Sequence, residues 1–207
     1  MKKILIIGGG AMGSAFTFPC IDNKNEVTIT EPYNKTFIKN LSSKNKYHSS
    51  LKINLPNKLK YKKYSTLLLK NKYDLVVVAL SLSGINFISE EFKKSNIKSP
   101  ILILTKGLKY EKKKQKIFTI SADIKKSNKH INVSVLKGPC LAKELSNKKQ
   151  TSVIVANKNI KTAKKICNMI TTKYYLTETS KDVIGVEICS SIKNIYSMII
   201  GAGDSLN

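Results

Sequence analysis

Two lysines of this 207-residue chain stand where they could bind an anionic ligand. Lys106 follows the apolar run at residues 101–104 and precedes Gly107, which favours a side chain facing a crevice. Lys193 is the only basic residue after Lys181 and lies in an apolar, small-residue stretch. Burying an ammonium group is costly unless it meets an anion, so we interpret both lysines as candidate substrate ligands. For Lys193, an ion pair with Glu187 or a side chain extending to solvent are the alternatives.

A glycine-rich turn near the N-terminus could hold phosphates. Residues 8–13, Gly8-Gly9-Gly10-Ala11-Met12-Gly13, follow an apolar run and fit the pattern G-x-G-x-x-G. In this pattern Gly8 permits a tight turn, Gly10 lets the backbone approach a diphosphate, and Gly13 allows close packing. The free N–H groups of the helix start would then face the phosphates. Similar turns also occur at ordinary strand ends, so the surrounding residues must decide.

Glu31 is the second candidate element of a dinucleotide site. It follows an expected strand at residues 27–30 and stands 18 residues after Gly13. In dinucleotide-binding units an acid near this position binds the ribose hydroxyls and repels a 2′-phosphate, which favours NAD over NADP. A solvated residue that begins the turn at Pro32 is the alternative.

Apolar and amphipathic segments alternate along the chain. Pro19 is expected to bend or shorten the first helix. Strands alternating with helices predict an α/β fold with a doubly wound parallel sheet, in which the loops after Ile7, Leu80, Leu104 and Leu136 converge on one crevice. The expected strands are 3–7, 27–30, 75–80, 101–104, 131–136, 152–155 and 174–176, and the expected helices are 11–22, 36–41, 64–70, 85–94, 113–125, 160–169 and 183–200.

The composition is strongly basic. The net charge is +24, and all 37 basic residues are lysines. Without arginine for bidentate contacts, we do not expect nucleic-acid binding, and we interpret the lysines mainly as compositional drift with a solvated surface. A selected basic face is the alternative. Either surface would attract small anions and nucleotides.

Cysteine and histidine placement gives no sign of a metal site. The four cysteines are widely separated, which favours free thiols in a reducing compartment and therefore a cytoplasmic protein. His48 and His130 lie in polar stretches and are expected at the surface. The chain has no run of about eighteen apolar residues, so no membrane span is expected, and the early glycines fit a signal peptide poorly.

Four motifs follow one another along the chain: GGGAMGSA at 8–15, TKGL at 105–108, GPCLAKEL at 138–145 and GVEICSSIKNI at 185–195. Together they resemble the NAD(P)-dependent sn-glycerol-3-phosphate dehydrogenases, in the style of the bacterial biosynthetic enzymes. The resemblance implies a Rossmann-like NAD-binding domain over residues 1–180, with residues 181–207 as the first helix of an incomplete all-α domain. It also implies hydride transfer between a nicotinamide and the pair dihydroxyacetone phosphate and glycerol 3-phosphate, for phospholipid synthesis, and a homodimer in the full-length form.

The same resemblance implies roles for individual residues. Lys193 would be the catalytic lysine, and Lys106 would bind substrate and cofactor and support a developing oxyanion. A neutral lysine can accept a hydroxyl proton, and an ammonium group can stabilise negative charge on oxygen. The further implied ligands are Gly138, Cys140 and Asn194 for the substrate, and Gly8, Gly9, Gly10, Ala11, Met12, Gly13, Glu31, Ser81 and Ala142 for the cofactor.

The chain also departs from this family. Cys140 stands where the family commonly has Ser, and Ser190 and Ser191 where it has Ala or Gly. The family's helical domain supplies an Arg-Asn pair for the substrate phosphate, and this chain has no Arg. We therefore expect an N-terminal fragment. A related hydroxy-acid or ketopantoate reductase and a non-catalytic NAD-binding module remain as alternatives.

Overall fold

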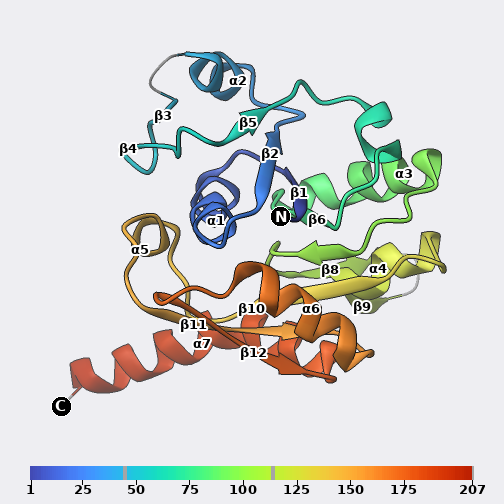
Figure 1. Cartoon of the computed structure of the whole chain (residues 1–207). Coiled ribbons are helices and arrows are strands. Elements are labelled where there is room, and N and C mark those ends of the chain that lie inside the picture. Colours follow the sequence, from blue (N-terminus) through green and yellow to red (C-terminus); the bar gives the residue numbers. More distant parts are fainter. Residues whose placement is uncertain (44–45, 113–114, 207) are drawn as a thin grey trace.

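The computed structural model describes residues 1–43, 46–112 and 115–206. Its main sheet has eight strands in the order β12-β11-β10-β7-β6-β1-β2-β5 (Figure 1). The six strands from β5 to β10 run parallel and follow the strand order of a doubly wound dinucleotide-binding sheet. The bounds are β1 (Lys3–Ile7), β2 (Glu26–Thr30), β5 (Lys60–Tyr61), β6 (Leu75–Val78), β7 (Ile101–Ile103), β10 (Val133–Lys137), β11 (Thr151–Ala156) and β12 (Tyr175–Ser180).

Helices cover both faces of this sheet, and each face has its own core. Along β1, Ile4 and Ile6 enter one core while Leu5 and Ile7 enter the other, because successive side chains alternate across a strand. This burial on both faces explains the continuous apolar runs of the central strands. The first core is covered by α1 (Ala11–Asp22), α2 (Lys35–Ser42), α5 (Ala142–Ser146) and α6 (Ile160–Ile170), and the second by η1 (Thr66–Lys70), α3 (Ile85–Ser95), α4 (Ile120–Ser127) and the start of α7 (Val183–Leu206).

The last two strands correct the expectation of a wholly parallel sheet. β11 runs antiparallel to β10, with Lys137 opposite Ile154, and β12 then runs parallel to β11. The connection from β10 to β11 contains only the five-residue helix α5. This short segment turns the chain back at the same end of the sheet instead of crossing over it, so the direction reverses.

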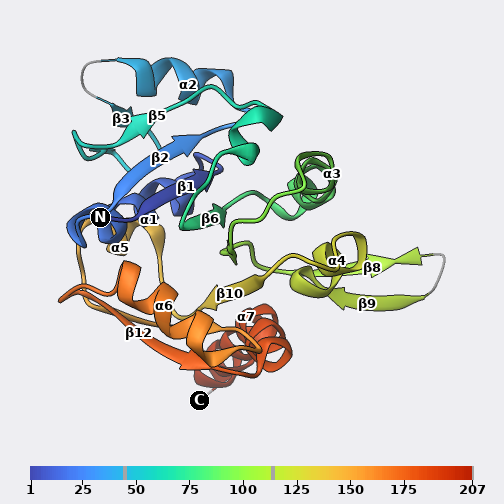
Figure 2. The same cartoon turned by 45° about the vertical axis from the view of Figure 1, so that its right-hand side comes forward.

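Several short elements differ from the sequence-based expectation. β8 (Leu108–Glu111) pairs antiparallel with β9 (Lys116–Thr119), and the pair projects beside α4 in Figure 2. The helix expected over 113–125 is therefore wrong at 116–119, where Thr119 instead caps α4 by accepting from Ala122 N–H; Lys113 and Lys114 lie outside the described residues. Where a helix is expected over 64–70, Thr66–Lys70 form a short 3-10 helix, η1, and α1 continues through Pro19 to Asp22. A second hairpin joins β3 (Tyr47–His48) to β4 (Ile53–Asn54).

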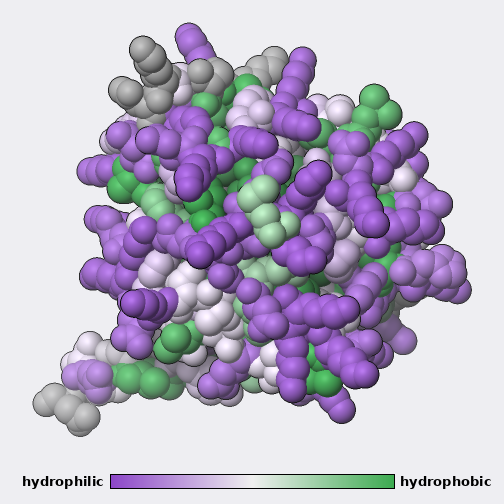
Figure 3. Space-filling model, in the orientation of Figure 1, coloured by the Kyte–Doolittle hydropathy of each residue, from purple (hydrophilic) through white to green (hydrophobic). Residues whose placement is uncertain are grey.

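Helix α7 leaves the body of the molecule after its first turns. Val183 and Glu187 are buried, whereas apolar side chains further along the helix are exposed. Figure 1 shows the helix extending away from the sheet, and Figure 3 shows apolar side chains on it beside a mostly hydrophilic surface. Val183–Ser205 is long enough and apolar enough to cross a membrane. Core helices of soluble proteins can have the same length and composition. The expected absence of a membrane span stays a prediction.

Candidate functional site

The glycine turn joins β1 to α1 through two close backbone approaches. Gly8 has a φ of +113°, and a Cβ atom there would lie 2.5 Å from the Ala79 carbonyl oxygen. A Cβ atom on Gly13 would lie 2.0 Å from the Gly8 carbonyl oxygen. Both positions therefore require glycine. Gly10 differs, because nothing lies within 4 Å of its Cβ position and the residue is exposed.

The open side of this turn fits an anionic ligand. The first hydrogen bond of α1 runs from Ser14 N–H to Gly10 O at 3.0 Å, which leaves the N–H groups of Ala11, Met12 and Gly13 without helical acceptors. Together with the positive end of the helix dipole, such donors bind phosphate groups. Free space at Gly10 and unpaired donors at the helix start match the predicted diphosphate site.

Glu31 lies at the end of β2 and contacts the glycine turn directly. Its carboxylate accepts hydrogen bonds from Gly9 N–H at 2.6 Å, Tyr33 N–H at 2.8 Å and Asn34 N–H at 3.2 Å. The residue is only 6% exposed, so the alternative of a solvated turn residue is wrong. The carboxylate is fixed beside the turn, as a ribose ligand would have to be.

A cavity of about 330 Å³ opens at the carboxyl ends of β6, β7 and β10. The loops after these strands converge there with the start of α1, as expected, and Thr105 Oγ1 donates to Leu80 O at 2.7 Å to join two of the loops. Five residues implicated by the sequence line this cavity, namely Met12, Lys106, Gly138, Cys140 and Ala142.

Lys137 also lines the cavity, and the sequence analysis missed it. The side chain is 5% exposed, and its Nζ donates to the carbonyl oxygens of Thr105 and Leu104. Burial lowers the pKa of Lys137 to about 8; the Glu187 carboxylate opposes this shift and Lys106 adds to it. A signal was present, because Lys137-Gly138 repeats the pairing of Lys106 with Gly107 after an expected strand.

Two further side chains, those of Cys140 and Tyr175, add uncharged polar groups to the cavity. Burial raises the pKa of the Cys140 thiol to about 11, so Cys140 is a neutral thiol at neutral pH. Tyr175, on β12, is fully buried, and its hydroxyl has no hydrogen-bond partner among the described residues. An unpaired buried hydroxyl is free to bond a ligand that enters the cavity.

The structure does not bring Lys193 into this cavity. Lys193 is exposed on α7, and the residues that line the cavity do not include it. Glu187 is not its ion-pair partner, because that carboxylate is buried against Ser121. Asn194 lies in α7, and its side chain is outside the described part of the structure. Ser81, on the loop after β6, is exposed, with its Oγ 2.8 Å from Ser83 Oγ.

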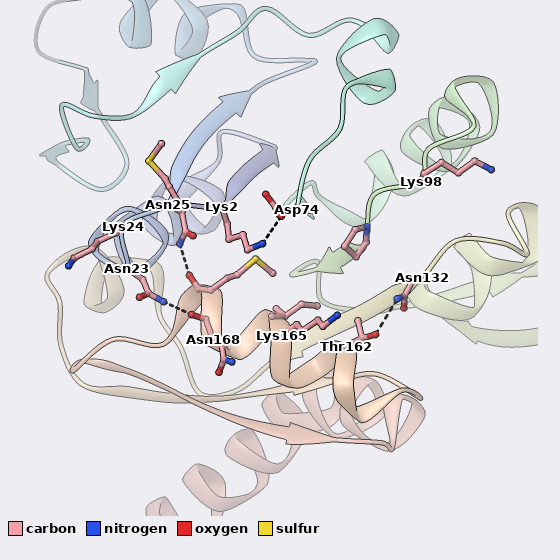
Figure 4. Close-up of a pocket in the computed structure, with 14 residues that line it drawn as sticks. Lys2, Asn23, Lys24, Asn25, Asp74, Lys98, Asn132, Thr162, Lys165 and Asn168 are labelled. Atoms are coloured by element: carbon pink, nitrogen blue, oxygen red, sulfur yellow. Dashed lines mark hydrogen bonds and ion pairs between the residues drawn. The ribbon is translucent and has the colours of Figure 1, made fainter.

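A larger cavity of about 660 Å³ lies at the opposite, amino-terminal edge of the sheet (Figure 4). There Lys2 pairs with Asp74 at 3.1 Å. The ammonium groups of Lys24 and Lys98 point away from each other and out of the cavity in Figure 4. Its charges do not converge on one point, and ligands of doubly wound sheets bind at the carboxyl ends of the strands. We therefore place the candidate site at the smaller cavity.

Strand order, glycine turn and carboxyl-edge cavity together define a Rossmann-type dinucleotide-binding domain. Residues 3–163 match the family model described as the N-terminus of NAD-dependent glycerol-3-phosphate dehydrogenase. The chain belongs to this family.

Curated relatives cover the whole chain. The NAD(P)+ glycerol-3-phosphate dehydrogenase of Oceanobacillus iheyensis is 25% identical over 208 residues, with 100% of this chain and 59% of the relative covered. The corresponding enzyme of Leptospira biflexa is 30% identical over 207 residues, with 99% and 61% covered. The chain thus spans about three fifths of the length of these relatives.

Solved structures share the fold. Glycerol-3-phosphate dehydrogenase from Coxiella burnetii superposes with a TM-score of 0.82 at 22% identity, covering 99% of this chain and 62% of that one. The Plasmodium falciparum enzyme gives 0.84 at 21% identity, covering 100% and 60%. The agreement confirms the predicted α/β class.

Proposed function

We propose that this chain is the cofactor-binding part of an NAD(P)-dependent glycerol-3-phosphate dehydrogenase. Such an enzyme interconverts dihydroxyacetone phosphate and glycerol 3-phosphate by hydride transfer, and its product serves phospholipid synthesis. The observation that carries the proposal is the shared cavity. Met12 from the glycine turn, Lys106 from the β7 loop and Ala142 from α5 line one space at the carboxyl edge of the sheet.

The cofactor would lie across the glycine turn. The N–H groups of Gly10, Ala11 and Met12 would bind the diphosphate. The Glu31 carboxylate would bind the adenosine ribose and favour NAD over NADP, because a second anion at the 2′ position would be repelled. When bound, the nicotinamide supplies or accepts the hydride; Ala142, at the start of α5, and Ser81, on the loop after β6, would contact it.

Lysine side chains would stabilise negative charge on the substrate. Lys106 would bind the reacting oxygen and stabilise negative charge on it, and the buried ammonium group of Lys137 adds positive potential to the same cavity. Gly138 and Cys140 would contact the substrate beside them. Lys193 is assigned the exchange of the hydroxyl proton by resemblance, with Asn194 as a substrate ligand.

Residues 1–180 would form the NAD-binding domain, and residues 181–207 would begin an all-α substrate domain. The exposed apolar side chains of α7 support this division, since a helix of this composition is normally packed against others. In full length we propose a cytoplasmic homodimer. No nucleic-acid or membrane partner is part of the proposal.

The test is NADH oxidation with dihydroxyacetone phosphate. It compares this chain with a version extended through the genomic reading frame, each with and without Lys193→Ala. We expect activity in the extended protein and a loss of about a hundredfold or more in its Lys193→Ala variant. Activity that survives this substitution would contradict the role of Lys193. NAD binding without any turnover would instead favour a non-catalytic module, and turnover of ketopantoate would favour the related reductases.

A further inference from the structure

His48 is buried against the glycine turn, which corrects its expected surface position. It belongs to the β3–β4 hairpin between α2 and β5 and is only 4% exposed. Its Nε2 atom lies 3.1 Å from Gly9 O, and its Nδ1 atom accepts a hydrogen bond from Leu51 N–H at 3.2 Å. The ring also packs edge to face against Phe37, with centroids 5.3 Å apart. His130, by contrast, is exposed, as expected.

These contacts define the protonation state of the ring. Nδ1 can accept from Leu51 N–H only when it carries no proton, so the neutral ring has its proton on Nε2 and donates to Gly9 O. Ser14 Oγ donates to the same carbonyl at 2.9 Å. On the other side of this residue, Gly9 N–H donates to Glu31. Both the N–H and the C=O group of Gly9 are therefore fixed by hydrogen bonds.

The carbonyl held by His48 belongs to the same planar peptide as the Gly10 N–H. In a trans peptide the C=O and N–H bonds point in opposite directions, so fixing Gly9 O also fixes the direction of Gly10 N–H. That N–H has no partner among the described residues, and Gly10 is exposed with open space around it. It is the first free donor of the predicted diphosphate site.

We propose that His48 is a positioning residue for the diphosphate of the bound dinucleotide. The neutral ring holds the Gly9–Gly10 peptide so that Gly10 N–H points outward to a phosphate. The inference rests on the proposed cofactor function.

The charged neighbours of His48 are few. Glu31, at the end of β2, is the carboxylate held on the same turn, and α2 contributes the uncharged ring of Phe37. Within the hairpin region, Lys46 donates to the carbonyl oxygens of Asn57 and Leu59, and Lys52 follows the turn. Because Glu31 already accepts from three backbone N–H groups, it is committed to the turn rather than to the imidazole.

Calorimetric titration of the whole chain with ADP-ribose tests this inference. ADP-ribose has the diphosphate but no nicotinamide, so it reports on the glycine turn alone. We expect His48→Leu to bind about fivefold more weakly than the wild type, as expected for one lost hydrogen bond. His48→Gln keeps a donor for Gly9 O, so it should bind like the wild type.

His130→Gln is the matched control, because it removes the other histidine from an exposed position. It should keep the affinity of the wild type. Wild-type affinity in His48→Leu would overturn the role of His48; so would weaker binding by a folded His48→Gln, even if His48→Leu fails to fold. A wild-type chain that binds no ADP-ribose would overturn the proposed cofactor function itself, and this inference with it.

Discussion

The Glu187 carboxylate accepts hydrogen bonds from both the backbone N–H and the hydroxyl of Ser121, with the N–H bond at 3.1 Å. Both residues are buried, and they come from α7 and α4. The contact attaches the first turns of α7 to the sheet face that carries α3 and α4. It also places a negative charge where it favours the charged form of Lys137 in the cavity.

Replacing Glu187 by alanine should destabilise the chain by about 2–4 kcal/mol, because Ser121 loses its acceptor and Lys137 its opposite charge. Urea unfolding measures the change. Glu90→Ala on the exposed face of α3 is the control and should change stability by less than about 0.5 kcal/mol. Equal effects of the two substitutions would mean that the Ser121 contact adds nothing.

Lys137 should make stability depend on pH above neutrality. Its pKa is lowered from 10.5 to about 8 in the folded chain, so between these values the unfolded chain binds a proton that the native chain lacks. Native stability then rises with pH across this window, by at most about 3 kcal/mol. Unfolding in urea at about pH 7.5 and about pH 9.5 should show the rise in wild type and lose it in Lys137→Met. The exposed control Lys143→Met should keep the rise; if Lys137→Met keeps it too, the assignment is wrong.

Alanine at two positions of the glycine turn should separate folding from binding. Gly13→Ala places a Cβ 2.0 Å from Gly8 O and should destabilise the chain by about 3 kcal/mol or more. Gly10→Ala meets no atom within 4 Å, so the chain should fold normally while ADP-ribose binding weakens about tenfold. Thermal unfolding and ADP-ribose titration measure the two effects. Wild-type ADP-ribose affinity in Gly10→Ala would mean that the diphosphate does not bind against Gly10.

Glu31 should set the cofactor preference. Glu31→Ala removes the carboxylate charge and its three hydrogen bonds to the turn. We expect the affinity for NAD to fall about tenfold and the preference for NAD over NADP to become smaller. Glu31→Gln, which keeps the size but not the charge, should improve NADP binding. Titrations with NAD and with NADP measure the ratio of the two affinities. The same ratio in the wild type, Glu31→Ala and Glu31→Gln would mean that Glu31 does not select the cofactor.

Local patterns were enough to predict the elements around the glycine turn. The apolar run before Gly8, the helix after Gly10 and the acid at Glu31 are close in sequence, and their order corresponds directly to β1, α1 and β2. His48 and Lys137 were missed because their burial depends on distant partners. His48 lies in a two-residue strand with no periodic signal, and Lys137 resembles the many surface lysines of this chain.

The direction of the edge strands could not be predicted for a similar reason. The mostly apolar residues 152–155 fit a strand of either direction, and only the length of the α5 connection decides between the two directions. For Lys193 the local motif is distinctive, but the motif does not show the surroundings of the side chain. The function of Lys193 depends on what packs against α7.

The reversal at β11 also has a kinetic consequence. Because β11 returns along β10, Lys137 meets Ile154 across a short loop, whereas Val133 meets Ile101 only after β8, β9 and α4 have intervened. Closing a short loop loses less chain entropy, and local contacts form faster than distant ones. The wall of the cavity that carries Gly138, Cys140 and Ala142 can therefore assemble early, as a small folding unit. We expect the glycine turn to dock onto this surface afterwards.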